Sequence, residues 1–89
     1  MPFEFDARKS GRTKADPNRG IDFVQAQSLW LDPCRIEVPL PFAVEPRVAV
    51  IGKIEQKIWT AIITQRGDNV RIICVRRAHP KEERIYEEG

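Results

Sequence analysis

The clearest pattern in the chain is a series of apolar runs in its second half. Residues 47–54 and 58–65 are each rich in apolar side chains and have the length of a strand, so both are predicted to be strands. The connection between them, residues 55–57, is short and predicts an antiparallel hairpin. A second hairpin turn is predicted at 66–69, where Gly67 and Asn69 tolerate positive φ. It leads into a last strand with a continuous apolar centre, as in strands covered on both faces.

The first third of the chain predicts one short strand and two helices. Phe3-Glu4-Phe5 alternates like a strand, and Asp6 suits the N-cap of a polar helix that Pro17 and Gly20 end. Asp22 suits the N-cap of a second helix that runs to Asp32-Pro33 and turns its Phe23 and Trp30 toward the core.

The remaining segments complete the expected order of elements. Residues 34–38 alternate and predict a strand near a sheet edge because Pro39 and Pro41 follow, 39–46 predicts a loop, and a closing helix begins at Pro80. The order β-α-α-β-β-β-β-α predicts an α+β fold, a small antiparallel sheet with two N-terminal helices and a C-terminal helix.

Composition narrows the class of protein. The chain has 89 residues, 42% of them hydrophobic and 31% charged, which predicts a single globular domain over residues 1–89. No apolar run is long enough to cross a bilayer, and the acidic N-terminus does not resemble a signal peptide. We expect a cytoplasmic protein without a membrane partner.

Charge and cysteine content leave two interpretations open. The net charge is only +2, but arginines gather in the first quarter and on the late strands. They suit either a phosphate-binding surface or solvated helix faces and strand ends. Cys34 and Cys74 lack metal-ligand spacing, so we expect free thiols, with Cys74 as a small buried apolar side chain, and no cofactor or metal.

Three arginines frame the last strand. Regular alternation places Arg71 and Arg77 on the face of Val75, and Arg76 on the opposite face with Cys74. The three guanidinium groups therefore cannot all face one substrate unless the strand bends. One of them is expected to be structural, held by an acid such as Glu83.

Arginine suits RNA cleavage because its planar fork matches phosphate and stabilises a pentavalent phosphorane without a metal. RNA supplies its own nucleophile, the 2′-hydroxyl. The only histidine, His79, suits a general acid or base, and equally a surface residue beside a helix. No catalytic triad or phosphate loop is present.

The sequence resembles the BrnT toxins of bacterial type II toxin–antitoxin systems. The matching pieces are Phe3-Glu4-Phe5-Asp6 with Lys9; Gly20-Ile21-Asp22-Phe23 with Ala26 and Leu31-Asp32-Pro33; Glu45-Pro46-Arg47 leading to Ile51-Gly52; Thr64 with Arg66; Arg71-Ile72-Ile73-Cys74-Val75-Arg76-Arg77-Ala78; and Glu83-Arg84 with Tyr86-Glu87.

The resemblance implies a RelE-like fold and a ribosome-independent endoribonuclease that arrests growth. It also implies a BrnA-like antitoxin with a ribbon-helix-helix domain, in a heterotetramer that binds operator DNA only through the antitoxin. The expected catalytic residues are Arg71, Arg76, Glu83 and Arg84. The expected RNA-binding residues are Lys9, Arg12, Arg47, Lys53, Arg66, Arg77 and His79. The cations of the first helix suit an acidic stretch of the antitoxin equally well.

Two departures from the family pattern leave the activity of this copy open. Many members carry histidine where this chain has Arg19, and a serine where it has Cys74. The alternative is therefore a catalytically weakened homologue that acts mainly as an antitoxin-binding co-repressor. A third alternative is a nucleic-acid-binding domain outside toxin systems, with salt-sensitive binding.

Overall fold

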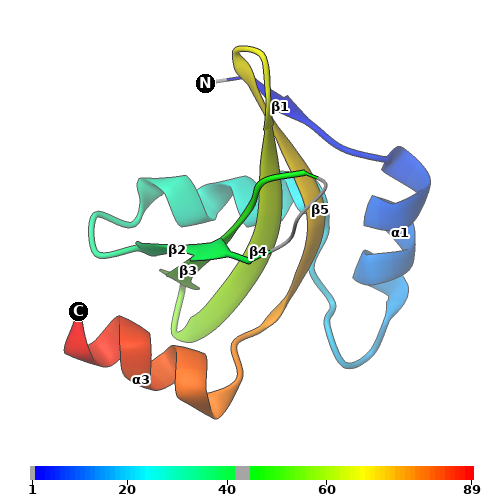
Figure 1. Cartoon of the computed structure of the whole chain (residues 1–89). Coiled ribbons are helices and arrows are strands. Elements are labelled where there is room, and N and C mark those ends of the chain that lie inside the picture. Colours follow the sequence, from blue (N-terminus) through cyan, green and yellow to red (C-terminus); the bar gives the residue numbers. More distant parts are fainter. Residues whose placement is uncertain (1, 42–44) are drawn as a thin grey trace.

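The computed structural model describes residues 2–41 and 45–89. Its elements are β1 (Phe3–Glu4), α1 (Ala7–Ala15), α2 (Phe23–Ala26), a 3₁₀ helix η1 (Gln27–Leu31), β2 (Ile36–Leu40), β3 (Arg47–Ile54), β4 (Lys57–Arg66), β5 (Asn69–Arg77) and α3 (Pro80–Glu88) (Figure 1). The general α+β prediction is confirmed. Part of the predicted loop 39–46, residues 42–44, lies outside the described residues.

The five strands form one mixed sheet in the order β1-β5-β4-β3-β2. The strands β2 to β5 form an antiparallel meander, and β2 is an edge strand that tolerates Pro39. The prediction of a purely antiparallel sheet is wrong at the other edge, where β1 runs parallel to β5. Local patterns do not reveal this pairing because it joins the two ends of the chain.

The predicted second helix is two shorter elements. Asp22 caps α2 as predicted, accepting from the Gln25 amide at 2.7 Å, but the helix tightens into η1 after one turn. The tighter winding puts Leu29 into the core with no exposed surface, although helical spacing had favoured Trp30. Trp30 faces the core as predicted but is only half-buried: it packs against the edge of the core and edge-to-face on Phe3, with ring centroids 4.8 Å apart.

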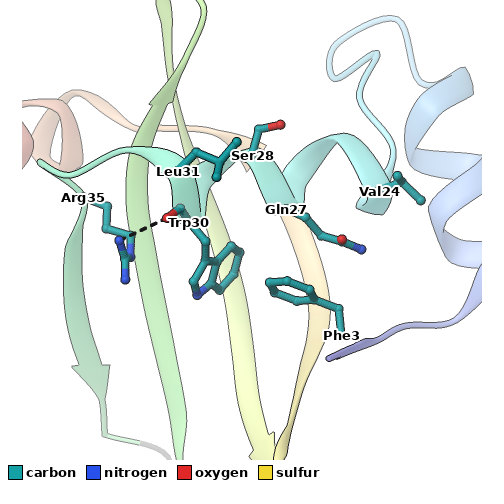
Figure 2. Close-up of a pocket in the computed structure, with 7 residues that line it drawn as sticks. All are labelled: Phe3, Val24, Gln27, Ser28, Trp30, Leu31 and Arg35. Carbon is teal, nitrogen blue, oxygen red and sulfur yellow. Dashed lines mark hydrogen bonds between the residues drawn. The ribbon is translucent and has the colours of Figure 1, made fainter. Parts of the chain in front are cut away.

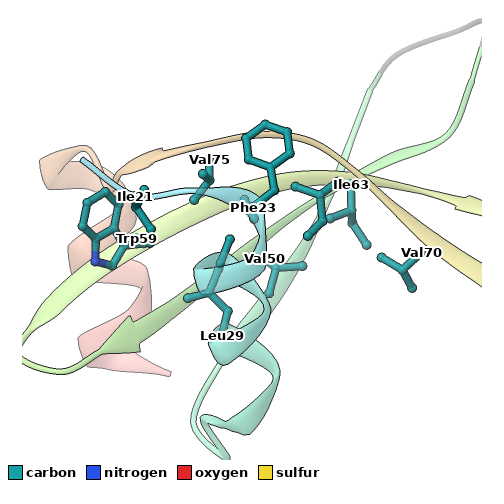
Figure 3. Packing of buried hydrophobic residues seen from close by; sticks show 11 residues of the cluster. Ile21, Phe23, Leu29, Val50, Trp59, Ile63, Val70 and Val75 are labelled. Atoms are coloured by element: carbon teal, nitrogen blue, oxygen red, sulfur yellow. The ribbon is translucent and has the colours of Figure 1, made fainter. Parts of the chain in front are cut away.

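The main core lies between one face of the sheet and the α2–η1 segment. Figure 3 shows Phe23 and Leu29 of the α2–η1 segment among buried side chains of the strands. The buried members are Ile21, Phe23, Ala26, Leu29, Val50, Trp59, Ala61, Ile63, Val70, Ile72 and Val75. On α1 the buried side chains are Ser10 and Thr13, and the Ser10 hydroxyl accepts from the Phe23 amide at 2.9 Å. The polar first helix is thus tied to the core.

A β-bulge interrupts the pairing of β4 with β5. Ile62 is opposite Cys74 and Ile63 is opposite Ile72, so Ile73 is an extra residue without a partner. A bulge of this kind shifts the alternation of side chains by one residue. Regular alternation was therefore the wrong prediction for β5. Arg71 and Arg76 lie on the same face of the sheet, whereas Arg77 lies on the core side with Trp59.

Two leucines two residues apart test the 3₁₀ register. We expect Leu29→Ala to lower the free energy of unfolding by about 3 kcal/mol, because it opens a cavity in the core. Leu31→Ala removes the same atoms from a side chain that is 83% exposed and should change stability by less than about 0.5 kcal/mol. Urea denaturation followed by tryptophan fluorescence measures both. Equal losses would contradict the assigned register.

Candidate functional site

The sheet face opposite the core, which we call the α3 face, carries most of the predicted site cations. In the register, residues that pair with core members lie on the core side of the sheet, and their neighbours along each strand face the other way. Among the described residues this rule places five cations on the α3 face: Arg47, Lys53, Arg66, Arg71 and Arg76.

Three side chains, from β5, β4 and β3, form a row across one end of the α3 face. Thr64 is opposite Arg71, and on its other side Arg47 follows in register next to the Val48–Ile63 pair. Neighbouring strands are spaced by about 4.8 Å, so the Cα atoms of Arg47 and Arg71 lie roughly 10 Å apart. The buried Thr64 hydroxyl donates to the Pro46 carbonyl at 2.7 Å and fixes the start of β3.

Two carboxylates border this row. Arg71 lies 3.7 Å from Glu4 of β1, whose other oxygen accepts from the Asn69 amide group at 2.6 Å. Arg66 lies 3.4 Å from Glu45 in a pair that is largely solvent-exposed. Such exposed pairs are weak, so both guanidinium groups can exchange their partner for an anionic ligand.

Arg76 is held much more firmly at the other end of the face. Its two terminal nitrogens donate to the two carboxylate oxygens of Glu82, at 2.7 and 2.9 Å. Glu82 also accepts from the Thr60 hydroxyl at 3.1 Å and from the His79 amide at 2.8 Å. The expected partner of the structural arginine, Glu83, is therefore wrong: the adjacent Glu82 takes that place because the first turn of α3 points it at β5.

The clamp shifts both ionisation equilibria toward the charged forms. Hydrogen bonds from Arg76 lower the pKa of Glu82 from 4.5 to about 2, against the opposing effect of burial. The same hydrogen bonds raise the pKa of Arg76 above its usual value. Glu82 is thus a permanent carboxylate at neutral pH that orients Arg76.

A second polar link holds the C-terminal half of α3. The Tyr86 hydroxyl donates to Asp32 at 2.7 Å, and Asp32 also accepts from the amides of Lys53 and Cys34 at 2.8 Å each. Burial alone would raise the pKa of Asp32, but these hydrogen bonds outweigh it and lower the pKa. The bond to Asp32 raises the pKa of Tyr86 to about 12. Since α3 buries no residue fully, these links at its two ends hold it in place.

Other predicted residues lie away from this arrangement. Lys9 and Arg12 line a separate hollow of about 230 Å³ on α1, with Asp16 and Arg19. Arg77 lies over the Trp59 ring, 5.5 Å from its centroid, on the core side of the sheet. By contrast, His79 adjoins the clamp: its exposed ring has Nδ1 3.9 Å from Glu82 Oε1. The Arg84 side chain is exposed on α3.

Sequence reasoning missed four polar partners of the α3 face. They are Glu4, Thr60, Thr64 and Glu82. The available signal was strongest for Glu82, which comes two residues after the first residue of a helix and six after Arg76. In the range 2–41 and 45–89, no group of three or more His, Cys, Asp or Glu side chains could hold a metal ion, and no helix is long and apolar enough to span a membrane.

The fold and this face define a small α+β protein with an arginine-lined sheet surface. The sequence profile of the family described as "Ribonuclease toxin, BrnT, of type II toxin-antitoxin system" matches residues 5–82. The chain belongs to this family of ribonuclease toxins, and a toxin of a type II system has an antitoxin as its partner. A comparison with curated proteins gave no match.

The clamp predicts a defined pH dependence. The pKa of Glu82 is lower in the folded than in the unfolded chain, so its contribution to stability is fully present above about pH 4.5 and is lost as the pH falls toward 2. At pH 7 we expect Glu82→Gln to cost on the order of 2 kcal/mol, and the difference from wild type should shrink by pH 3.

Urea denaturation at both pH values measures this difference. The matched control is Glu83→Gln, which removes the same charge from the next residue of α3 and leaves the Arg76 hydrogen bonds intact. An equal loss of stability in both variants, or a loss for Glu82→Gln that does not depend on pH, would contradict the clamp.

Proposed function

We propose that the chain, as one domain over residues 1–89, is a ribosome-independent, metal-free endoribonuclease toxin that cuts RNA on the α3 face. The observation that supports this most is the bulge at Ile73, because it brings Arg71 and Arg76 to the face that also carries Arg47. Membership of a ribonuclease toxin family supports the type of reaction. The α+β architecture is consistent with the RelE-like fold that we propose for it.

The arrangement suits a single RNA strand that lies along β5 with its phosphates toward the sheet. Arg71 and Arg76 are separated by roughly 15 Å along the strand, so they suit different positions of one RNA backbone. Arg47 widens the cationic strip across β4. Each guanidinium can donate two parallel hydrogen bonds to a phosphate.

In the proposed reaction the RNA 2′-hydroxyl attacks the adjacent phosphorus. A pentavalent phosphorane forms, the bond to the 5′-oxygen breaks, and a 2′,3′-cyclic phosphate remains. Arg76, pre-oriented by Glu82, stabilises the extra negative charge without having to reorganise. Glu82 is unsuited as a base because its pKa is about 2. We propose His79 and Glu83 as the groups that transfer protons, and Arg84 as a further phosphate contact.

We further propose a BrnA-like ribbon-helix-helix antitoxin as the partner, in a heterotetramer that contacts operator DNA through the antitoxin alone. The support is the toxin–antitoxin family itself. Cleavage would then take place in the cytoplasm, where the cell's RNA and the antitoxin are found together.

The cleavage proposal is tested on single-stranded RNA in the presence of EDTA. Wild-type protein should cleave it. Arg76→Lys keeps the charge but loses the bidentate geometry and should slow cleavage about 100-fold, while Arg71→Ala should weaken RNA binding and reduce its salt dependence.

The matched control is Lys81→Ala, an exposed cation on α3 outside the α3-face set, which should cleave at the wild-type rate. Urea denaturation verifies that each variant is folded. Cleavage that EDTA abolishes would contradict the metal-free mechanism, and full activity of both arginine variants would contradict the location of the site.

Two substitutions favour the alternative of a weakened toxin that acts as a co-repressor. Cys74, at the position where the resemblance places a serine, lies on the α3 face between Arg71 and Arg76. Arg19, at the position of a family histidine, lines a hollow of about 410 Å³ with Lys57 and Trp59. Neither replacement side chain offers the same proton-transfer chemistry at neutral pH.

Cys74→Ser tests this alternative directly. If a hydroxyl at this position assists cleavage, the variant should cut RNA about tenfold faster than wild type, since general acid–base or hydrogen-bond assistance is worth at least that much. The measurement is the single-turnover rate, with Cys34→Ser, an exposed thiol, as control. Growth arrest by wild-type protein without antitoxin, together with an unchanged rate in Cys74→Ser, would rule the alternative out.

A further inference from the structure

An apolar groove lies beside the α2–η1 segment, on the core side of the sheet. Its volume is about 590 Å³, and Figure 2 shows its side chains, with the rings of Phe3 and Trp30 edge-to-face. The lining residues are Phe3, Val24, Gln27, Ser28, Trp30, Leu31 and Arg35. The α2–η1 segment covers the core face of the sheet, so the groove and the arginine face lie on opposite sides of the sheet.

The groove contains an unusual exposure of apolar surface. Val24 is 59% exposed and Leu31 is 83% exposed, and among the described residues these are the exposed large hydrophobic side chains. Both line this groove, seven residues apart, or about two helical turns, and Leu31 also borders a neighbouring hollow with Lys53 and Tyr86. They add nothing to the core, and a clustered apolar exposure of this kind marks a binding surface.

Contacts within the protein support two sides of the groove, one at the Phe3 and Trp30 rings and one at Arg35. Phe3 and Trp30 meet edge-to-face at 4.8 Å with an interplanar angle of 73°. The Arg35 guanidinium donates to the carbonyls of Trp30 and Asp32, each at 3.3 Å. A partner would therefore meet a preformed surface and would not have to order it.

Arg35 gives the groove its charge preference. It is the charged residue among those that line the groove, and the Glu37 carboxylate lies 3.4 Å from its Nε in a half-exposed pair. The groove therefore favours a ligand that is apolar along one side and carries a carboxylate where it passes Arg35. One cation beside four apolar side chains is poorly suited to RNA, and a symmetric contact with a second copy would bring two Arg35 groups into one interface.

We propose that this groove binds the antitoxin, through an amphipathic helical segment with apolar side chains at helical spacing and an acidic side chain opposite Arg35. Helix-in-groove binding fits two apolar contacts that lie two turns apart. The proposal rests on the proposed function only for the existence of the antitoxin. It adds that the antitoxin holds the toxin from the side of the sheet opposite the arginines.

The test uses the whole chain and the antitoxin that its own operon encodes, with affinity measured by calorimetric titration. Leu31→Asp puts a charge into the groove at a position that is 83% exposed and should weaken binding about tenfold or more. Val24→Asp should behave in the same way. Gln56→Asp, an exposed change in the β3–β4 turn, is the matched control and should bind within twofold of wild type.

Each outcome has a defined meaning. Weaker antitoxin binding by Leu31→Asp and Val24→Asp, with unchanged RNA cleavage by the free protein, supports the groove. Unchanged antitoxin affinity overturns it, as does a loss of RNA binding or cleavage in these variants. A wild-type dimer that Leu31→Asp converts to a monomer, with antitoxin affinity unchanged, assigns the groove to a second copy and also overturns it.

The proposed function is judged separately in the same experiment. Antitoxin binding that depends on the groove, with no RNA cleavage by wild-type protein, would overturn the endoribonuclease and retain the groove. RNA cleavage with groove-independent antitoxin binding would do the reverse. A chain that shows neither binding nor cleavage would overturn both.

Discussion

The β-bulge at Ile73 is the constraint on which the candidate site depends. One unpaired residue shifts the side-chain alternation of β5, so that Val70, Ile72 and Val75 can all be buried while Arg71 and Arg76 share the other face. Without it, burying Val75 would place Arg71 on the core side, opposite Gln65, and would remove it from the face that carries Arg47 and Arg76. The same residue therefore allows a continuous core and a continuous arginine face.

The two ends of that face differ in how their arginines are held. Arg76 is clamped by Glu82, which removes its net charge from the surface but fixes the direction of its donors. Arg71 and Arg66 have looser, more exposed carboxylate partners. In the proposed function, the loosely paired cations attract the RNA backbone and the clamped one stabilises charge that develops during cleavage. This division follows from electrostatics, since attraction needs net charge and transition-state stabilisation needs fixed geometry.

Much of the fold could be predicted because its signals are local. The caps Asp6 and Asp22, the two hairpins and the edge position of β2 follow from turn chemistry and alternation. The features that were predicted wrongly depend on contacts between distant parts of the chain. The parallel pairing of β1 with β5 joins the two ends of the chain, and the change from α2 to η1 accompanies the burial of Leu29 in the core. For the candidate site, residue type alone selected the arginines as candidates. The bulge and the pairing of Arg76 with Glu82 depend on three-dimensional register and could not be predicted.

The position of α3 connects the site to the rest of the molecule. This helix buries no residue fully, and hydrogen bonds hold it at Glu82 and at Tyr86. Asp32, which receives the Tyr86 bond, directly follows η1, the 3₁₀ helix that carries Leu31 and Trp30. The segment that forms the wall of the groove is thus joined by one side chain to the helix that orients Arg76.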